Sequence, residues 1–235
     1  MGFIINPYAY ASGNDPHWAN VVLLVAFSGA DGSTTFTDLS TVGRTLTAVG
    51  NVQVDTAITK FGNPTGLFDG TGDYITAPNA ADISVANETD KTIECFFYLN
   101  ATGRIHTLVD KRDTTNAEEF SFQITAANVL QFAVFGAATV RASIVSATTL
   151  SISTWYHGAA VRTGGDTWQL FLDGVSQGTD VETAQPQSNT ETLTIGRSKF
   201  NTARDLQGHM AQLRYTNAAR YTGNFSPPSA PFPTA

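Results

Sequence analysis

The stretch Thr154–Gly174, TWYHGAAVRTGGDTWQLFLDG, decides the fold. Two runs rich in apolar residues flank Thr163–Asp166, and strands joined by a short loop that contains glycine form a β-hairpin. In the second run, Thr167–Leu172, apolar and polar residues alternate, so one face of the strand is buried and the other is wet. Phe171 interrupts the polar face and therefore requires an apolar neighbour of its own. The run ends on Asp173-Gly174, a dipeptide that favours a turn.

Similar short runs recur along the chain, separated by Gly, Asn or Asp, and none has the sustained 3.6-residue period of a helix. The strongest of them are Val21–Phe27, Thr92–Leu99, Ile105–Val109, Phe120–Thr125, Val129–Phe135, Val140–Val145, Glu191–Gly196 and His209–Asn217. This pattern predicts an all-β protein, an antiparallel β-sandwich of the jelly-roll type. We expect an N-terminal arm at 1–19, one jelly-roll domain at 20–225 and a Pro-rich tail at 226–235.

The composition and charge of the chain argue against nucleic-acid and membrane partners and against an internal disulfide. The 235-residue chain has a net charge of −7, which opposes binding to nucleic acid. Apolar runs are shorter than a membrane span requires, and the first residues lack the basic and apolar regions of a signal peptide. The single cysteine, Cys95, lies in an apolar run and is expected to be buried without a disulfide partner.

Taken in order, the motifs resemble the laminin-G-like, concanavalin A-like jelly-roll family, in its phage and bacterial branch. The resemblance covers residues 16–233 and rests on Val21–Phe27, Lys60-Phe61-Gly62, Gly66–Gly70 with Asp73-Tyr74, Thr92–Phe97, Trp155-Tyr156-His157 with Leu170–Gly174, Ile195-Gly196, and Ala219–Phe225 with Pro227-Pro228. It implies two curved antiparallel sheets whose rim loops or concave face bind glycans or partners. The closing stretch ARYTGNF looks like the form found in virion structural proteins.

The resemblance therefore predicts a non-enzymatic protein of the virion surface, either a capsid decoration protein or a tail or fibre component. The alternative is an adhesion module that recognises surface glycans. The arm lacks regular periodicity and is too apolar to remain solvated, so it packs on its own domain or docks on other virion proteins or copies of the chain. The residues that would make this contact are Phe3, Ile4, Ile5, Tyr8 and Tyr10.

Enzymatic chemistry has little support in the sequence. The glucanases of this fold place alternating acids on one strand, and that spacing does not occur here. Glu118 and Glu119 are adjacent and should point in opposite directions. Asp110 and Asp113, beside Lys111 and Arg112, have the pattern of a solvated loop.

No cofactor is expected, although a calcium ion at the rim stays open because the loop acids Asp31, Asp69, Asp73 and Asp205 are suitable oxygen ligands. The four histidines lack the spacing of a zinc site, and His157 is expected to be structural. Trp155 and Trp168 are expected to fill the core, which leaves no evident aromatic platform for a sugar.

Overall fold

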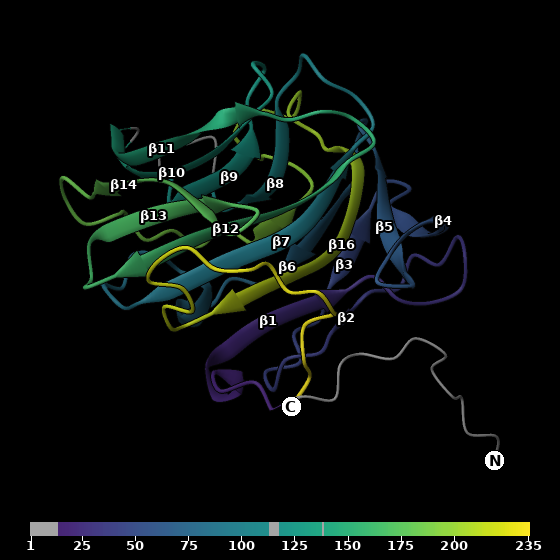
Figure 1. Ribbon diagram of the computed structural model, residues 1–235, viewed down its shortest axis with the longest axis horizontal. Helices are drawn as coiled ribbons and strands as arrows, with labels where there is room; N and C mark the ends of the chain where they lie inside the picture. The colour runs from purple at the N-terminus through teal and green to yellow at the C-terminus, as the bar shows by residue number, and fades with distance from the viewer. Residues whose placement is uncertain (1–13, 113–117, 138) are drawn as a thin grey trace.

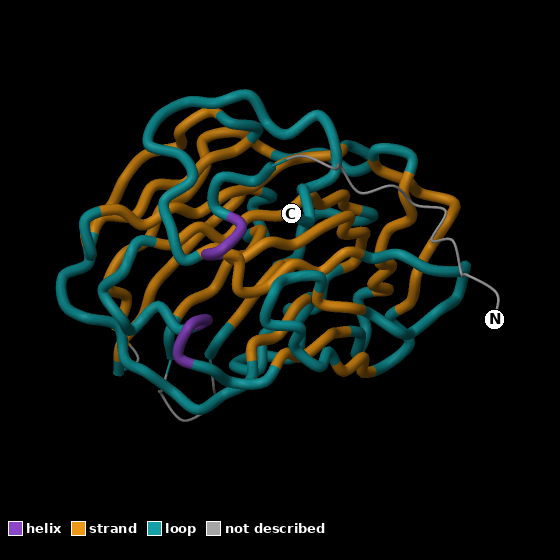
Figure 2. Tube along the Cα trace, turned by 90° about the horizontal axis from the view of Figure 1, so that it is seen from below, coloured by secondary structure: helices purple, strands orange, loops and turns teal. Residues whose placement is uncertain are grey.

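The computed structural model describes residues 14–112, 118–137 and 139–235. Within these ranges the chain is built from β-strands, and the helical content consists of two short 3-10 turns, η1 (Trp18–Asn20) and η2 (Ala81–Ile83) (Figure 2). None of the helices in these ranges is long and apolar enough to cross a membrane. The expected all-β sandwich of antiparallel sheets is confirmed.

Sheet A contains the first and the last strand side by side near its middle. Its strands follow the order β14-β13-β12-β7-β16-β1-β2, and β5 pairs with β16 and with β4. Their bounds are β1 (Val21–Ala26), β2 (Thr37–Asp38), β4 (Gln53–Lys60), β5 (Asn63–Asp69), β7 (Lys91–Leu99), β12 (Trp155–Thr163), β13 (Thr167–Leu172), β14 (Val175–Val181) and β16 (Gln207–Thr216).

Sheet B lies behind sheet A in Figure 1 and follows the order β11-β10-β9-β8-β15-β6-β3. Its strands are β3 (Thr47–Val49), β6 (Tyr74–Ala77), β8 (His106–Asp110), β9 (Phe120–Ile124), β10 (Val129–Gly136), β11 (Thr139–Thr149) and β15 (Leu193–Ile195). Three of these strands, β9, β10 and β11, form a continuous antiparallel ladder.

The main core fills the space between the two sheets, and period-two alternation decides which residues enter it. On β7, Ile93, Cys95 and Phe97 face the core, whereas Glu94 and Phe96 face outward. Burial raises the pKa of the Cys95 thiol, so this cysteine is an inert core residue as expected.

The hairpin of β12 and β13 forms as the sequence predicts, with Thr163 paired to Thr167 across the turn. Trp168, Leu170 and Leu172 all belong to the main core, which confirms the expected alternation. Trp155 differs from expectation because it starts β12 on the outer side of sheet A, where it packs half-buried against Phe96 and its neighbours.

The outer side of sheet A is covered by the two terminal segments of the described chain. In Figure 1 the yellow C-terminal segment crosses in front of this sheet. Residues 226–235 have no regular secondary structure, yet Phe232 is fully buried and its ring lies 5.5 Å from that of Phe96. We call this surface, beneath residues 15–18 and 217–235, the covered face.

Candidate functional site

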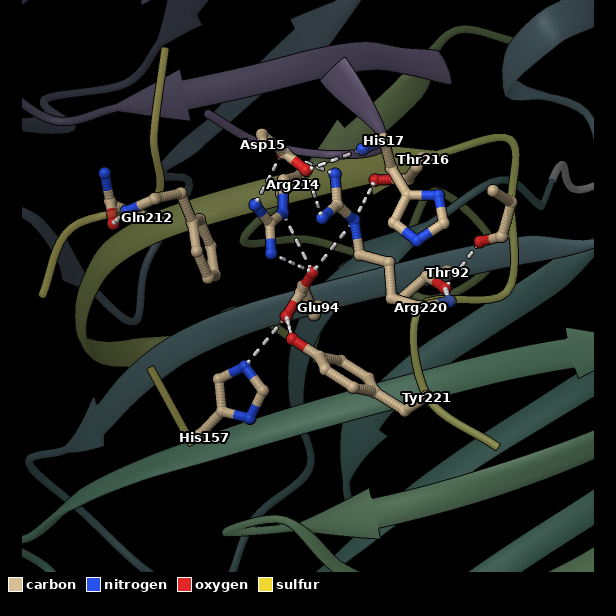
Figure 3. Close-up of polar contacts among 12 residues, drawn as sticks. Asp15, His17, Thr92, Glu94, His157, Gln212, Arg214, Thr216, Arg220 and Tyr221 are labelled. Atoms are coloured by element: carbon tan, nitrogen blue, oxygen red, sulfur yellow. Dashed lines mark hydrogen bonds and ion pairs between the residues drawn. The ribbon is translucent and has the colours of Figure 1, made fainter. Parts of the chain in front are cut away.

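A buried ionic network occupies the middle of the covered face (Figure 3). Glu94 on β7 lies opposite Arg214 on β16, and the Arg214 guanidinium is 2.7 Å from the Glu94 carboxylate. The Tyr221 hydroxyl donates to the same carboxylate at 2.9 Å, and Nε2 of His157 is 3.1 Å from it. His157 is therefore a structural group, as predicted.

Asp15 joins the two ends of the described chain to this network. Its carboxylate accepts hydrogen bonds from Arg220 at 2.8 and 3.0 Å and from Arg214 at 3.2 Å. Its backbone N–H donates to the carbonyl oxygen of Ala235 at 2.9 Å. Residues that are more than 200 positions apart in sequence thus meet in one polar cluster.

The electrostatics of the network favour ionised carboxylates. Burial alone would raise the pKa of Glu94, but the charge of Arg214 and the contact with His157 outweigh it and lower that pKa. Burial also opposes ionisation of Asp15, and the Arg220 hydrogen bond and the His17 N–H reverse the effect and lower its pKa. The side chains of Glu94, Arg214 and Arg220 are at most 6% exposed, and through Asp15, Arg220 and Tyr221 the cluster joins the terminal segments to sheet A.

The closing motif ARYTGNF packs against the turn that follows the central hairpin. Phe225 donates its N–H to the Gly174 carbonyl at 2.9 Å and packs edge-on against Phe171, with ring centroids 5.3 Å apart. Gly174 has a φ of +76°, and a Cβ at this position would overlap the Phe225 carbonyl. Tyr221 stacks on Phe225. The expected apolar neighbour of Phe171 is therefore supplied by the C-terminal segment.

The outer side of sheet B carries a row of amides and hydroxyls beside the segment that contains Phe200 and Arg204. Ser121 donates to Gln123 at 3.2 Å, Gln123 donates to Gln131 at 2.7 Å, and Gln131 donates to Ser143 at 3.1 Å. These side chains come from β9, β10 and β11. We call them the polar row.

Short side chains that lie between longer ones leave a groove that runs across these three strands. Ala133 and Ser143 lie side by side in register and form a low floor, while Ser121, next to Ala133 on β9, is fully buried. Gln123 and Gln131 stand two residues away along the strands on one side, and Phe135 stands on the other. The groove has a volume of about 360 Å³, and we call it the sheet B groove.

Two arginines and an exposed phenylalanine complete the aromatic wall of the groove. The Arg112 guanidinium lies 5.1 Å from the ring centroids of both Phe135 and Phe200. Arg204 also lies over Phe200, at 5.7 Å. Phe200 is 41% exposed, so part of its ring is open to solvent although both guanidinium groups lie over it.

The prediction of a solvated loop is wrong for Asp110, Lys111 and Arg112, whereas Asp113 lies outside the described residues. Asp110 and Lys111 are fully buried and Arg112 is 3% exposed. Lys111 lies 2.5 Å from Glu119, and Arg112 lies 2.7 Å from Asp110. Each buried charge has an opposite partner close in sequence, which is the condition under which burial is tolerated.

Glu118 and Glu119 point in opposite directions, as expected from their adjacency. Glu119 accepts from Lys111, from Ser84 at 2.9 Å and from the Asn189 N–H at 3.1 Å, whereas Glu118 lines the groove. Among the described residues that line the groove, Glu118 is the single acid.

Three of the four acids considered for calcium, Asp69, Asp73 and Asp205, come together, and each accepts hydrogen bonds from the chain. Both oxygens of Asp73 accept backbone N–H groups, from Asn51 at 2.7 Å and from Asp69 at 3.0 Å. Asp205 is engaged by the Arg197 guanidinium at 2.6 Å and by the Gly72 N–H. Burial and the nearby Asp69 and Asp205 charges raise the pKa of Asp73, although two N–H bonds oppose this.

The fourth acid, Asp31, lies elsewhere and accepts from Thr56. Within the described ranges the structure contains no group of three or more His, Cys, Asp or Glu side chains arranged to hold a metal. A calcium ion at the rim therefore stays a prediction from the sequence.

The residues predicted to bind a partner, Phe3, Ile4, Ile5, Tyr8 and Tyr10, lie outside the described residues. Sequence reasoning did not single out the groove. The available signal was the polar alternation on two neighbouring strands, with Ser121 and Gln123 in FSFQI and Gln131 in VLQFAVFG.

Comparison with solved structures identifies similar folds at low identity. The binding domain of Paraclostridial Mosquitocidal Protein 1 has a TM-score of 0.70 and 14% identity, over 87% of this chain and 50% of that one. A botulinum neurotoxin type C structure, described as showing that cell entry depends on two ganglioside molecules, has a TM-score of 0.66 and 14% identity, over 87% and 49%.

The binding domain of botulinum neurotoxin DC in complex with SialylT has a TM-score of 0.64 and 14% identity, over 87% of this chain and 49% of that one. This chain spans about half the length of these structures, and the likeness establishes the fold alone. No curated protein matches the chain in sequence.

The family assignment rests on sequence and structure together. Residues 69–222 match the family described as the concanavalin A-like lectin/glucanases superfamily. These residues run from the end of β5 to the closing motif and include the central hairpin and the groove strands. The chain belongs to the concanavalin A-like lectin/glucanase superfamily.

Proposed function

We propose that this protein is a carbohydrate-binding module and that the sheet B groove holds the glycan. The observation that carries the proposal is the polar row facing an exposed phenyl ring across a groove of about 360 Å³. Pockets of this kind bind small ligands when a few placed polar groups fix the orientation.

The chemistry of the lining matches a sugar. A glutamine amide offers two N–H donors and a carbonyl acceptor, so Gln123 and Gln131 retain hydrogen-bonding capacity beyond the bonds they make within the row. Sugar hydroxyls both donate and accept, and the C–H face of a pyranose ring packs on an aromatic ring such as Phe200. The neurotoxin structures whose descriptions mention gangliosides and SialylT support this use of the fold.

We propose binding without hydrolysis. Glycoside cleavage needs two carboxyl groups on either side of the scissile bond. The described lining of the groove supplies Glu118, and the neighbouring Asp110 is held by Arg112 beneath the surface. Incubation with β-glucans and release of reducing sugar test this point, and turnover would contradict it.

A glycan array tests the binding function, followed by titration of any ligand found with variants Phe200→Ala and Gln131→Ala. We expect each variant to weaken binding about tenfold or more, because a lost stack or hydrogen bond costs about 1–2 kcal/mol. Gln177→Ala is the matched control, since Gln177 is a half-buried glutamine on β14 outside the groove. Binding by none of the glycans, or equal effects in all three variants, would overturn the proposal.

We also propose the finer role predicted from the sequence, that the module is a structural protein of a phage virion surface. The observation in its favour is the position of Asp15, which is fixed on the covered face while the groove lies on the other sheet. Attachment through residues that precede Asp15 would leave the groove directed outward, toward host glycans.

Replacement of Phe3, Ile4, Ile5, Tyr8 and Tyr10 together by serine tests the attachment. We expect the variant to keep the wild-type thermal unfolding curve and to lose assembly with itself or with virus particles, as measured by sedimentation. Wild-type assembly by the folded variant would contradict the role of the arm.

A further inference from the structure

The charges around the sheet B groove are balanced. Arg112 is paired with Asp110 at 2.7 Å. Burial and the charge of Arg112 lower the pKa of Arg204, while Asp110 and Glu118 act in the opposite direction. Two guanidinium groups and the Glu118 carboxylate therefore line one end of the groove, the buried Asp110 carboxylate neutralises Arg112 from behind, and the rest of the lining is uncharged.

This balance disfavours an acidic sugar. A carboxylate on the ligand would add a third negative charge beside Glu118 and Asp110. It would also have to compete with Asp110 for a guanidinium that already donates to that acid and, at 3.0 Å, to Ser198. Like charges brought together in a partly desolvated site reject a ligand, and recognition depends on complementary potential.

The span of the groove across the strands sets the length of the ligand. Its lining comes from three neighbouring strands, with Gln123 on β9, Ala133 on β10 and Ser143 on β11. Because neighbouring strands are about 4.8 Å apart, the groove spans roughly 10 Å across them, which is close to the length of a disaccharide. The amide wall and the phenyl wall run parallel to it, so a linear glycan fits across the strands.

We infer that the groove selects an uncharged glycan and contacts about two consecutive sugar units of it. This inference rests on the proposed carbohydrate-binding function. It goes beyond the neurotoxin relatives, where one structure contains a ligand described as SialylT, because the charges on this chain point to a neutral ligand. Amides and hydroxyls hold the sugar, and the arginines support the Phe135 and Phe200 rings.

The experiment compares neutral oligosaccharides with acidic counterparts, including lactose against sialyllactose and chitotetraose against tetragalacturonate, on the full chain. We expect the bound glycans to be neutral, with a carboxylate lowering affinity about tenfold or more. Affinity should rise from mono- to disaccharide and then level off. It should change less than about twofold between low and high salt, because neutral ligands are not screened.

Two variants make the charge argument specific. Glu118→Gln should narrow the difference in affinity between neutral and acidic glycans, while Arg204→Gln should widen it. Thermal unfolding checks that both variants remain folded. If neither folds, the salt dependence and the ligand panel on the wild type still decide the outcome.

The results separate the two proposals. Acidic glycans that bind in the groove, lose affinity with Phe200→Ala and depend strongly on salt would overturn neutral selection and leave carbohydrate binding intact. Binding by none of the probes, or binding that Phe200→Ala does not change, would overturn the proposed function and this inference with it.

Discussion

The outer faces of the two sheets differ in what lies on them. Sheet A is covered by the chain's own terminal segments, which fill it with Phe232, Phe225 and a closed ionic network. Sheet B is left with small and amide side chains that form a groove. Buried charge joins distant segments on sheet A, whereas the amide and hydroxyl groups of sheet B line the groove for which we propose a glycan.

The largest effect should come from breaking the ionic network. Glu94→Gln removes one of the two buried carboxylates that pair with Arg214 and Arg220 and leaves them Asp15, which should lower the free energy of unfolding by about 3–5 kcal/mol. Urea unfolding measures this. Gln131→Ala on sheet B should cost only about 1 kcal/mol. Equal losses in both variants would remove the distinction between the two faces.

A smaller loss of stability should come from disturbing the contact between Gly174 and the closing motif. Gly174→Ala places a Cβ against the Phe225 carbonyl and should cost about 2–3 kcal/mol. Gly164→Ala is the matched control, because Gly164 also has a positive φ, of +65°, with open space around it, and should cost about 1 kcal/mol. The difference between the variants measures the contact itself, and no difference would mean that the closing motif contributes nothing there.

The covered face should also determine the response to acid. The pKa values of Glu94 and Asp15 in the folded chain lie below the ordinary values of 4.5 and 3.8. The stability from these groups is therefore complete above the ordinary values and is lost as the pH falls below them toward the folded-state values. Urea midpoints between pH 7 and pH 3 should fall less steeply for Asp15→Asn than for wild type. Parallel slopes would show that Asp15 gains no stability from its arginines.

The smallest effect on stability should come from the groove. Phe200→Ala removes a ring that is already 41% exposed and should change the free energy of unfolding by less than about 0.5 kcal/mol. The same variant is expected to lose glycan affinity. A large loss of stability would instead make Phe200 a structural residue and weaken the proposed site.

The sequence predicts what depends on local period and fails where distant segments meet. The alternation in Thr167–Leu172 places Trp168 in the core, and the break at Phe171 correctly indicates a missing neighbour. That neighbour is Phe225, which lies more than 50 residues away in the chain, so the sequence around Phe171 does not identify it. Similarly, the sequence around Asp15 does not predict its contact with Arg220. The charged run Asp110–Arg112 has the pattern of a solvated loop, and its burial depends on a partner outside the run, Glu119.

The sequence does not predict the sheet B groove, for a related reason. Period two assigns Gln123 and Gln131 to a wet face, but it cannot show that Ala133 lies between taller neighbours, because that depends on the register of three strands. Register also explains Trp155, whose position at the start of β12 directs it outward beside Tyr98.

The hydrogen bond between Asp15 and Ala235 makes the fold a candidate for circular permutation. A short glycine-serine linker could join these two residues, and new ends could open at the exposed Gly164 turn between β12 and β13. Such a permutant would keep the pairing of β1 with β16 while making it local in sequence. The same cut would make the pairing of β12 with β13 the most distant in sequence, so the folding rate of the permutant tests which of the two pairings limits folding.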